Sequence, residues 1–175
     1  MTNEAHKHEH QCNNDNHDHD HQESHFSILA QYTKDFSFEN PNAPKAILSL
    51  NEKPNIEIDL NIEVEKLENL TPEKNLPGEL FEVKLSIKTS AKEASSNSIL
   101  FHTEIEYAGV FLLSNIAQEH VRPLLFIEAP RLLFPFARQI LNDATRNGGY
   151  QPMLLDPIDF ASLYHNKFVN QEAKK

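Results

Sequence analysis

Histidines are the residues of this chain best suited to chemistry, and six of the ten lie within the first 24 residues. They form two alternating triplets: His6, His8, His10 and His17, His19, His21. Neutral imidazoles bind Zn, Ni and Cu ions, and alternate residues of an extended chain share one side. The surrounding residues are Asn, Asp, Glu and Gln with almost nothing apolar. This composition predicts a disordered arm over residues 1–25 and no firm metal site, with a metal-handling role as an alternative.

Motifs for catalysis are missing from the rest of the chain. It contains neither the GxxxxGK[ST] loop of nucleotide hydrolases nor the GxSxG turn of serine hydrolases. The histidines beyond residue 100 have no sequence neighbours that suggest a general base or a metal triad: His102, His120 and His165. Asp156 and Asp159 flank Pro157, a spacing typical of a helix that begins with Asp156 as its N-cap. We therefore predict no enzyme activity, no catalytic residue and no cofactor.

Composition limits the kinds of partner. A chain of 175 residues with 39% hydrophobic content is long enough for one domain. The formal net charge of -10 disfavours nucleic acid and favours a basic or zinc-bearing protein partner. The single cysteine, Cys12, cannot form an intramolecular disulfide and is compatible with a reducing cytosol. Without an apolar N-terminal core or a run of about 18 apolar residues, the chain is expected to be soluble and cytoplasmic.

Four segments alternate between apolar and polar residues, the pattern of antiparallel strands with one covered face. The first begins near Phe26, with Ala30, Tyr32, Phe36 and Phe38 expected on one side. The other three cover residues 56–65, 81–88 and 99–113. In the fourth, Ala108 and Gly109 indicate a bulge or close packing. These strands predict an antiparallel sheet that needs a helical cover.

The connections and helices follow from proline and glycine. Asn40-Pro41 and Ala43-Pro44 predict a crossover loop over residues 41–55. Prolines at 123, 130 and 135 are expected to break the helical region after residue 115, with a better helix from Pro130 to Asn147 before Gly148-Gly149. A second helix opens at Asp156 and carries an apolar stripe that includes Phe160, Leu163 and Tyr164.

Several uncommon blocks resemble the SecB family of bacterial protein-export chaperones. They are YTKDFSFENPNAP (residues 32–44), GVF (109–111), LLFPFAR (132–138) and GGYQPMLLDPIDFASLY (148–164). The resemblance covers residues 26–170 as the chaperone domain, followed by a short tail at 171–175. It implies an α+β fold in which a four-stranded antiparallel sheet carries helices packed on one side, assembled as a dimer of dimers.

The resemblance also implies the function. Members of the family are ATP-independent holdases that keep unfolded preproteins competent for translocation and deliver them to the SecA motor. The zinc-binding C-terminal tail of the motor docks on acidic residues that correspond here to Asp35, Glu39 and Glu104. Asp35 and Glu39 are four residues apart, so in a regular strand both point the same way. In the family, the position beside the matched glutamate is apolar. In this chain it is His102, so the docking contact at this position differs from that of the family.

The family further implies a client groove and an oligomer interface. The groove runs between the crossover loop and the last helix, with candidates Phe38, Pro41, Pro44, Phe160, Leu163 and Tyr164. The tetramer contacts are expected at Ile105, Leu133, Phe136 and Ile140. Two alternative functions stay open beside export: a SecB-like chaperone of a toxin-antitoxin system, and the metal-handling role of the histidine arm.

Overall fold

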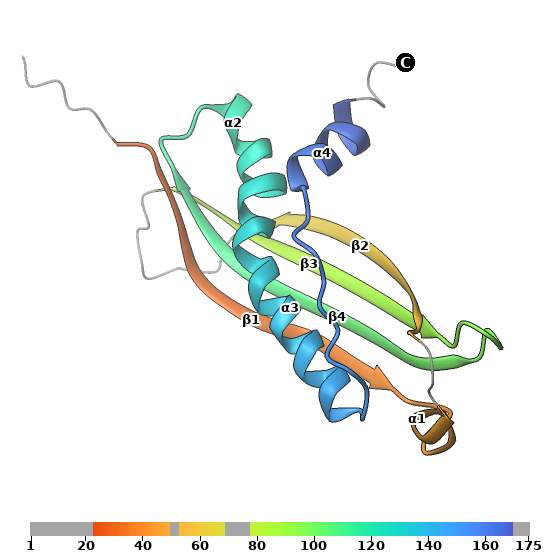
Figure 1. The fold of residues 1–175 in the computed structure, drawn as a ribbon. Helices are drawn as coiled ribbons and strands as arrows, with labels where there is room; N and C mark the ends of the chain where they lie inside the picture. The colour runs from red at the N-terminus through yellow and green to blue at the C-terminus, as the bar shows by residue number, and fades with distance from the viewer. Residues whose placement is uncertain (1–22, 50–52, 69–77, 170–175) are drawn as a thin grey trace, which may run out of the picture.

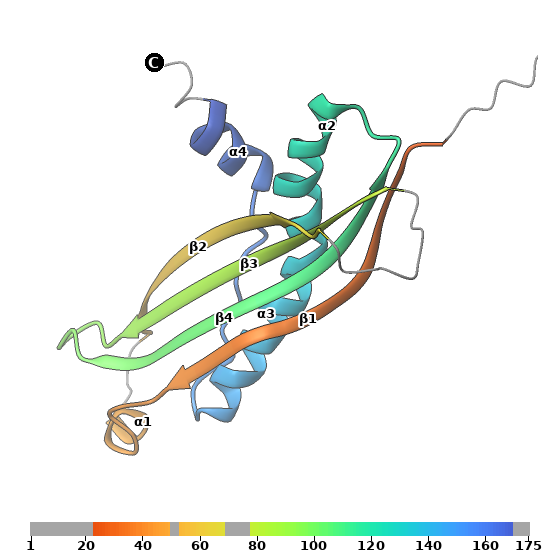
Figure 2. The ribbon, with the colours of Figure 1, turned by 180° about the vertical axis from the view of Figure 1, so that it is seen from behind.

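A single antiparallel sheet forms the centre of the protein. The computed structural model describes residues 23–49, 53–68 and 78–169. The strands are β1 (His25–Glu39), β2 (Asn55–Lys66), β3 (Glu79–Lys92) and β4 (Ile99–Ser114), in the order β1-β4-β3-β2. The long helix and the C-terminal helix lie on one face of this sheet, and no helix of the described residues lies on the other face (Figures 1 and 2). The predicted α+β fold with a four-stranded antiparallel sheet is confirmed.

Alternation in the sequence separates the two faces of the sheet. In β3, Val83, Leu85 and Ile87 are fully buried toward the helices, whereas Lys84 and Lys88 point to the opposite side. We call these sides the helix face and the open face. β2 pairs with β3 over its whole length without a register shift, so its isoleucines and valine share the helix face and its carboxylates share the open face. The predicted alternation therefore sets which chemistry each face presents.

The first strand differs from the expected pattern. Its pairing with β4 is shifted twice, between Ile28 and Ala30 and between Thr33 and Asp35. Each extra residue of a bulge reverses the direction of the side chains that follow. Tyr32 lies opposite Ala108 on the open face, whereas Phe36 lies opposite Ile105 on the helix face. The prediction that Ala30, Tyr32, Phe36 and Phe38 share one side is therefore wrong: the first two and the last two lie on opposite faces.

Three helical segments follow one another without a loop. They are α2 (Gln118–Pro123), the π-helical turn η1 (Leu124–Glu128) and α3 (Ala129–Asn147). Pro123 is the last residue of α2, and Pro130 lies in the first turn of α3, where a missing N–H costs little. The expected breaks at the prolines are thus reduced to one π-helical turn between two α-helices. The predicted end at Asn147 is confirmed, and Gly149 adopts a φ of +90°.

Helix α3 packs closely on the centre of the sheet. Its inward stripe is fully buried and repeats every four residues: Ala129, Leu133, Ala137 and Leu141. A Cβ atom on Gly109 of β4 would lie 2.8 Å from Cδ2 of Leu133, so a larger residue would force this buried side chain to move. The pairing of β4 with β3 is continuous through this residue. Of the two readings of Ala108-Gly109, close packing is correct and a bulge in β4 is not.

The predicted crossover loop contains a short helix, α1 (Lys45–Ser49). A second apolar cluster holds this segment against the end of α3, with Phe38 and Ile47 packed on Phe101 and Tyr150. The Tyr150 hydroxyl donates to Oδ1 of Asn40 (2.9 Å) or to the carbonyl oxygen of Leu100 (3.0 Å). The crossover connection is therefore fixed at the C-terminal end of α3.

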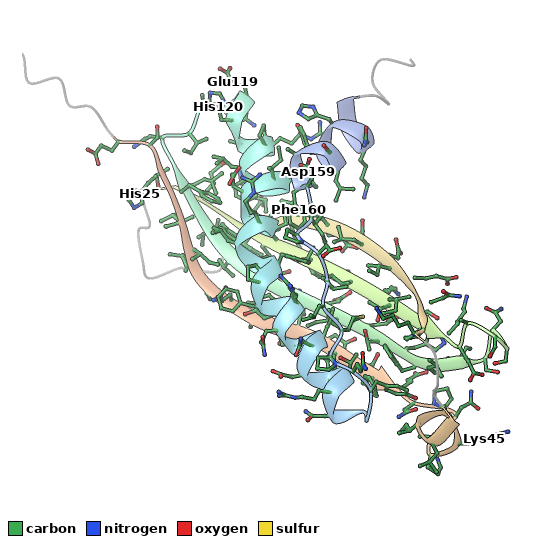
Figure 3. The ribbon with its side chains drawn as sticks, in the orientation of Figure 1. His25, Lys45, Glu119, His120, Asp159 and Phe160 are labelled. Carbon is green, nitrogen blue, oxygen red and sulfur yellow. The ribbon has the colours of Figure 1, made fainter. Side chains whose placement is uncertain are left out.

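The last helix begins later than predicted. Helix α4 (Phe160–Tyr164) is followed by the π-helical turn η2 (His165–Val169). Its N-cap is Asp159, whose carboxylate accepts from the backbone N–H of Ser162 at 3.0 Å, and not Asp156 (Figure 3). Both aspartates suit a cap, but burial of Phe160 against Phe134 fixes where the helix starts.

Thr145 holds the chain after α3 in place. This fully buried residue donates its hydroxyl to the carbonyl oxygen of Leu141, and its oxygen accepts from the backbone N–H of Met153 at 2.9 Å. Thr145→Val keeps the shape of the side chain but leaves the Met153 N–H buried without an acceptor. We expect the free energy of unfolding to fall by about 1–3 kcal/mol.

Urea unfolding at fixed protomer concentration measures this change. Thr33→Val on the exposed surface of β1 is the matched control, expected to stay within about 0.5 kcal/mol of the wild type. Equal stability of the two variants would contradict the role of Thr145.

Candidate functional site

The open face brings together the three carboxylates expected to bind a partner. In the register of β1 with β4, Asp35 lies opposite Glu106, Ser37 opposite Glu104, and Glu39 opposite His102. Residues opposite each other in a ladder point to the same side. Because the register is unbroken from residue 35 to residue 39, Asp35 and Glu39 point the same way, as the spacing predicted. All three carboxylates are exposed on a face that none of the described helices covers.

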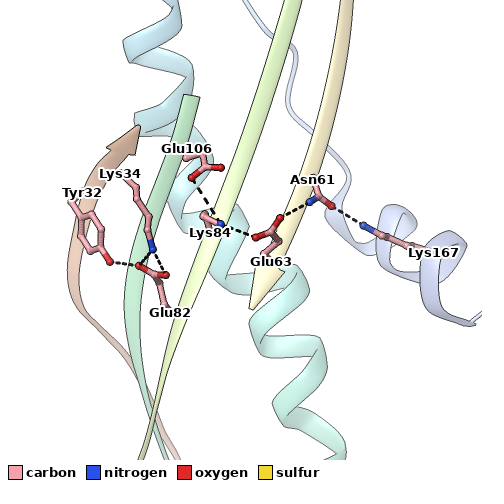
Figure 4. Close-up of polar contacts among 8 residues, drawn as sticks. All are labelled: Tyr32, Lys34, Asn61, Glu63, Glu82, Lys84, Glu106 and Lys167. Atoms are coloured by element: carbon pink, nitrogen blue, oxygen red, sulfur yellow. Dashed lines mark hydrogen bonds and ion pairs between the residues drawn. The ribbon is translucent and has the colours of Figure 1, made fainter. Parts of the chain in front are cut away.

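Lysines from neighbouring strands pair with some of the carboxylates of this face. Nζ of Lys84 lies 2.7 Å from Glu63 and 3.9 Å from Glu106, and thus links β2, β3 and β4 (Figure 4). Nζ of Lys88 lies 3.0 Å from Glu104. The hydrogen bond with Glu63 raises the pKa of Lys84, and the one with Glu104 raises the pKa of Lys88. These lysines stay charged at any physiological pH.

Carboxylates nevertheless outnumber lysines on the open face. The register assigns it these acids: Asp35, Glu39, Glu57, Asp59, Glu63, Glu65, Glu82, Glu104 and Glu106. The lysines paired with them are Lys34, Lys84, Lys88 and Lys92. Within the described ranges, Asp35, Glu39 and Asp59 have no cation within 4.0 Å. The face therefore carries an excess of negative charge that attracts cationic partners.

A shallow cavity of about 480 Å³ lies in the acidic half of this face. All four strands contribute to its lining, including Glu39 from β1, Asp59 from β2, Ser90 from β3 and Glu104 from β4. His102 also lines it. Sequence reasoning did not include the β2 carboxylates in this site, although their alternation with isoleucine shows that they lie on one side of the strand.

A partly buried polar trio occupies the other half of the open face. The Tyr32 hydroxyl donates to Glu82, and Nζ of Lys34 lies 2.6 Å from the same carboxylate. The hydrogen bond to Glu82 raises the pKa of Tyr32 to about 12. Sequence analysis missed this trio because it depends on the two bulges that turn Tyr32 and Lys34 toward β3. These contacts hold the edge strand β1 to β3 across the intervening strand β4.

An apolar pocket of about 250 Å³ opens on the helix face between β2 and the C-terminal helix. Its lining comes from four elements: Leu60, Ile62, Phe126, Leu163, Tyr164, Asn166 and Lys167. Farther along the same side of β2, Ile56 and Ile58 are 41% and 51% exposed. The pocket and these isoleucines together form an accessible apolar strip, which we call the β2 strip.

The residues predicted for the client groove do not form one wall. Leu163 and Tyr164 line the β2 strip, but Phe160 is only 1% exposed and belongs to the main core. Phe38 stacks on Phe101 in the cluster at the end of α3, beside the exposed Pro41 and Pro44. The two halves of the predicted set are thus separated within the protomer, because the crossover connection folds toward the end of α3 and away from α4.

The residues predicted for the oligomer interface also fall into two groups, one buried and one exposed. Ile105 and Leu133 are buried between α3 and the sheet, so in the folded protomer they are not available to a second chain. Phe136 is 45% exposed and stacks on Tyr107, and Ile140 is partly exposed one turn later. Leu132, which the prediction omitted, is 47% exposed on the same side of α3. The outward stripe of α3 is therefore Leu132, Phe136 and Ile140.

The two histidine triplets lie outside the described residues. In the part of the chain that the structure describes, no three His, Cys, Asp or Glu side chains are arranged to hold a metal ion. The same part contains no helix that is long and apolar enough to cross a membrane.

Known proteins of one family match this chain over most of its length. The family described as Preprotein translocase subunit SecB matches residues 19–171. The Protein-export protein SecB of Bartonella bacilliformis is 46% identical over 150 residues, which cover 86% of this chain and 87% of that protein. The protein of the same name from Brucella ovis is 47% identical over 152 residues, covering 87% and 86%.

A solved structure shares the fold at much lower identity. It is a SecB-like chaperone of Mycobacterium tuberculosis in complex with a peptide from an antitoxin, with a TM-score of 0.55 and 15% identity. The match covers 76% of this chain and 90% of that one. The family match and the relatives extend over nearly the whole described chain. The chain belongs to the SecB family, the chaperones of preprotein export.

Proposed function

We propose that this protein is an ATP-independent holdase of the cytosol that keeps unfolded preproteins competent for translocation and passes them to the SecA motor. The observation that carries the proposal is the convergence of Asp35, Glu39 and Glu104 on the uncovered, acidic open face. A basic, zinc-bearing tail of the motor is the partner that this face suits, because their charges are complementary. The chain holds no nucleotide-binding loop, so release of the client depends on the motor.

The proposed docking surface is a sheet face and not a closed pocket. Exposed charges in water interact weakly at each contact, so affinity requires several carboxylates acting together. The contribution of such charges is also screened by salt. Docking on the open face should therefore be fast, reversible and salt-sensitive, which suits a chaperone that must hand over its cargo repeatedly.

Clients are proposed to bind at the β2 strip. β2 is an edge strand with no proline and no bulge, and among the described residues one side of its backbone has no strand partner, which suits hydrogen bonds with an extended chain. Backbone hydrogen bonds do not depend on sequence, and the exposed Ile56 and Ile58 provide apolar contacts. This combination accepts many unfolded chains but not folded ones, whose backbones are already paired.

Assembly as a dimer of dimers is proposed to use the outward stripe of α3. Leu132, Phe136 and Ile140 follow one another at intervals of four residues on an otherwise amphipathic helix. Exposed large apolar residues arranged in this way favour contact with another apolar helix surface. A second copy of α3 would provide such a surface.

Export is favoured over the toxin-antitoxin alternative. Identity to the export proteins is 46–47% over most of the chain, against 15% for the SecB-like chaperone bound to an antitoxin peptide. The metal-handling alternative has no support from the described residues, and the arm that suggested it lies outside them.

The first test removes the carboxylates of β1. Asp35→Ala with Glu39→Ala should weaken binding of the SecA zinc tail by about 5- to 30-fold at low salt, since each lost contact with a cation contributes up to about 1 kcal/mol. Titration calorimetry gives the affinity. Glu119→Ala with Glu128→Ala, on the helical segments, is the charge-matched control. Unchanged tail affinity in the β1 double variant would refute the docking site.

The second test concerns the β2 strip. Leu163 is 41% exposed, so Leu163→Ser should leave the fold intact while removing apolar contact area. Loss of about 1 kcal/mol of contact predicts an affinity for an unfolded precursor about five-fold lower. Suppression of precursor aggregation provides the measurement, and Leu154→Ser, an exposed leucine outside the strip, is the control. A larger effect at Leu154 than at Leu163 would place the client elsewhere.

The third test concerns assembly. Phe136→Asp places a charge in the outward stripe of α3, and we expect native mass measurement to show a smaller particle because burying an unpaired carboxylate is costly. Arg138→Asp, two residues farther along α3 and therefore on the opposite side of the helix from the stripe, should leave the mass unchanged. A full-size particle for Phe136→Asp would exclude this stripe as an interface.

A further inference from the structure

The first strand begins with an exposed histidine. β1 starts at His25, which lies opposite Ser114 of β4. The next residue, Phe26, stacks on the fully buried Phe111 with 5.3 Å between the ring centroids, and so faces the core. Successive side chains of a strand point to opposite sides, so the His25 imidazole projects away from the core (Figure 3). Among the described residues, it has no hydrogen bond and no ion pair.

Two hydrogen bonds hold the chain just before His25. Ser24 Oγ donates to the carbonyl oxygen of Asn115 at 3.0 Å, and Nδ2 of Asn115 donates to the carbonyl oxygen of Glu23 at 3.4 Å. Asn115 directly follows β4, so these contacts fix the point at which the N-terminal segment joins the sheet. A side chain that the fold already positions loses less conformational entropy on binding an ion than one that must first be ordered.

The alternation of histidines in the sequence continues to this point. Every second residue from position 17 to position 25 is of a metal-ligating type: His17, His19, His21, Glu23 and His25. Such residues share one side of an extended chain, which here is the side of the His25 imidazole. Zinc, nickel and copper ions prefer imidazole ligands of this kind.

Carboxylates add to the attraction for a cation. Asp18, Asp20 and Glu23 give residues 17–25 a formal charge of -3 when the imidazoles are neutral. This negative charge raises the local concentration of divalent cations. The first triplet, His6, His8 and His10, has no histidine two or four residues after it and is not next to a described element. The inference is therefore confined to residues 17–25.

We propose that residues 17–25 form a binding site for one divalent ion of the zinc and nickel type, with the imidazoles of His17, His19, His21 and His25 as ligands. Four nitrogen ligands satisfy the tetrahedral coordination that zinc prefers. His21 and His25 are about 13 Å apart along a fully extended chain, so the segment before Glu23 must bend toward His25 when the ion binds. The described residues provide one of the four ligands, which agrees with the lack of a complete metal-binding group among them.

Titration calorimetry with zinc chloride tests this site in the full-length chain. The starting protein carries His6→Gln, His8→Gln, His10→Gln and Cys12→Ser, so that the heat reports residues 17–25. At about pH 7.5, where imidazoles are largely neutral, it should bind one zinc ion per protomer. Loss of an outer-shell partner already weakens metal binding by about 10- to 100-fold, so His25→Gln should weaken it by at least about ten-fold. His17→Gln with His19→Gln and His21→Gln should abolish binding.

His120→Gln is the matched control, because His120 is another exposed histidine of the described fold, on α2. It should leave the zinc affinity unchanged. If His25→Gln also leaves the affinity unchanged, the fold provides no ligand and the proposed site is refuted. A starting protein that binds no zinc would refute it as well. Neither outcome affects the proposals for the open face and the β2 strip, which use other residues.

Discussion

The packing of α3 on the centre of the sheet is the interaction on which the rest of the structure depends. Its inward residues are so well buried that the helix reaches the backbone of β4, where Gly109 leaves room for Leu133. One sheet with helices on one side can satisfy only one apolar face. The other face must be polar, and in this chain it is acidic. The packing of α3 on one face of the sheet thus produces two surfaces of different chemistry.

Those surfaces suit ligands of different kinds. The open face is charged and has only a shallow cavity. Contacts on it are therefore long-ranged, screened by salt and quickly exchanged. The β2 strip offers apolar area along a strand at the edge of the described sheet, and apolar contacts are short-ranged and independent of sequence. A chaperone that holds unfolded chains and then gives them to a partner needs both properties, and the sheet keeps them on opposite sides.

The sequence was sufficient to predict those helices and strands whose conformation depends on neighbouring residues along the chain. Alternation identified β2 and β3, and Gly148-Gly149 marked the end of α3, because each signal reflects the conformation of its own residues. The face shared by Asp35 and Glu39 was also predictable, since no bulge separates them. The bulges of β1 at residues 29 and 34 were not, because they arise from how β1 fits β4 and how Tyr32 and Lys34 reach Glu82.

Other differences between the predicted and the observed structure depend on tertiary packing. Asp156 and Asp159 suit a helix cap equally well, and burial of Phe160 selects the second. The stripe of α3 contains both Leu133 and Phe136, but only the geometry of the packed helix shows that the first faces the sheet and the second faces outward. The predicted groove joined residues that lie near opposite ends of α3, because sequence does not reveal where the crossover connection lies.

The two edges of the sheet differ in the regularity of their pairing. β1 is interrupted twice, and its Lys34 and Tyr32 are drawn inward to Glu82. Bulges disrupt the regular spacing of backbone donors and acceptors that an added strand requires. β2 keeps that spacing over its whole length, and Lys167 of η2 reaches across to Asn61 at its edge (Figure 4). Within the described residues, the C-terminal helix therefore lies beside the more regular of the two edges.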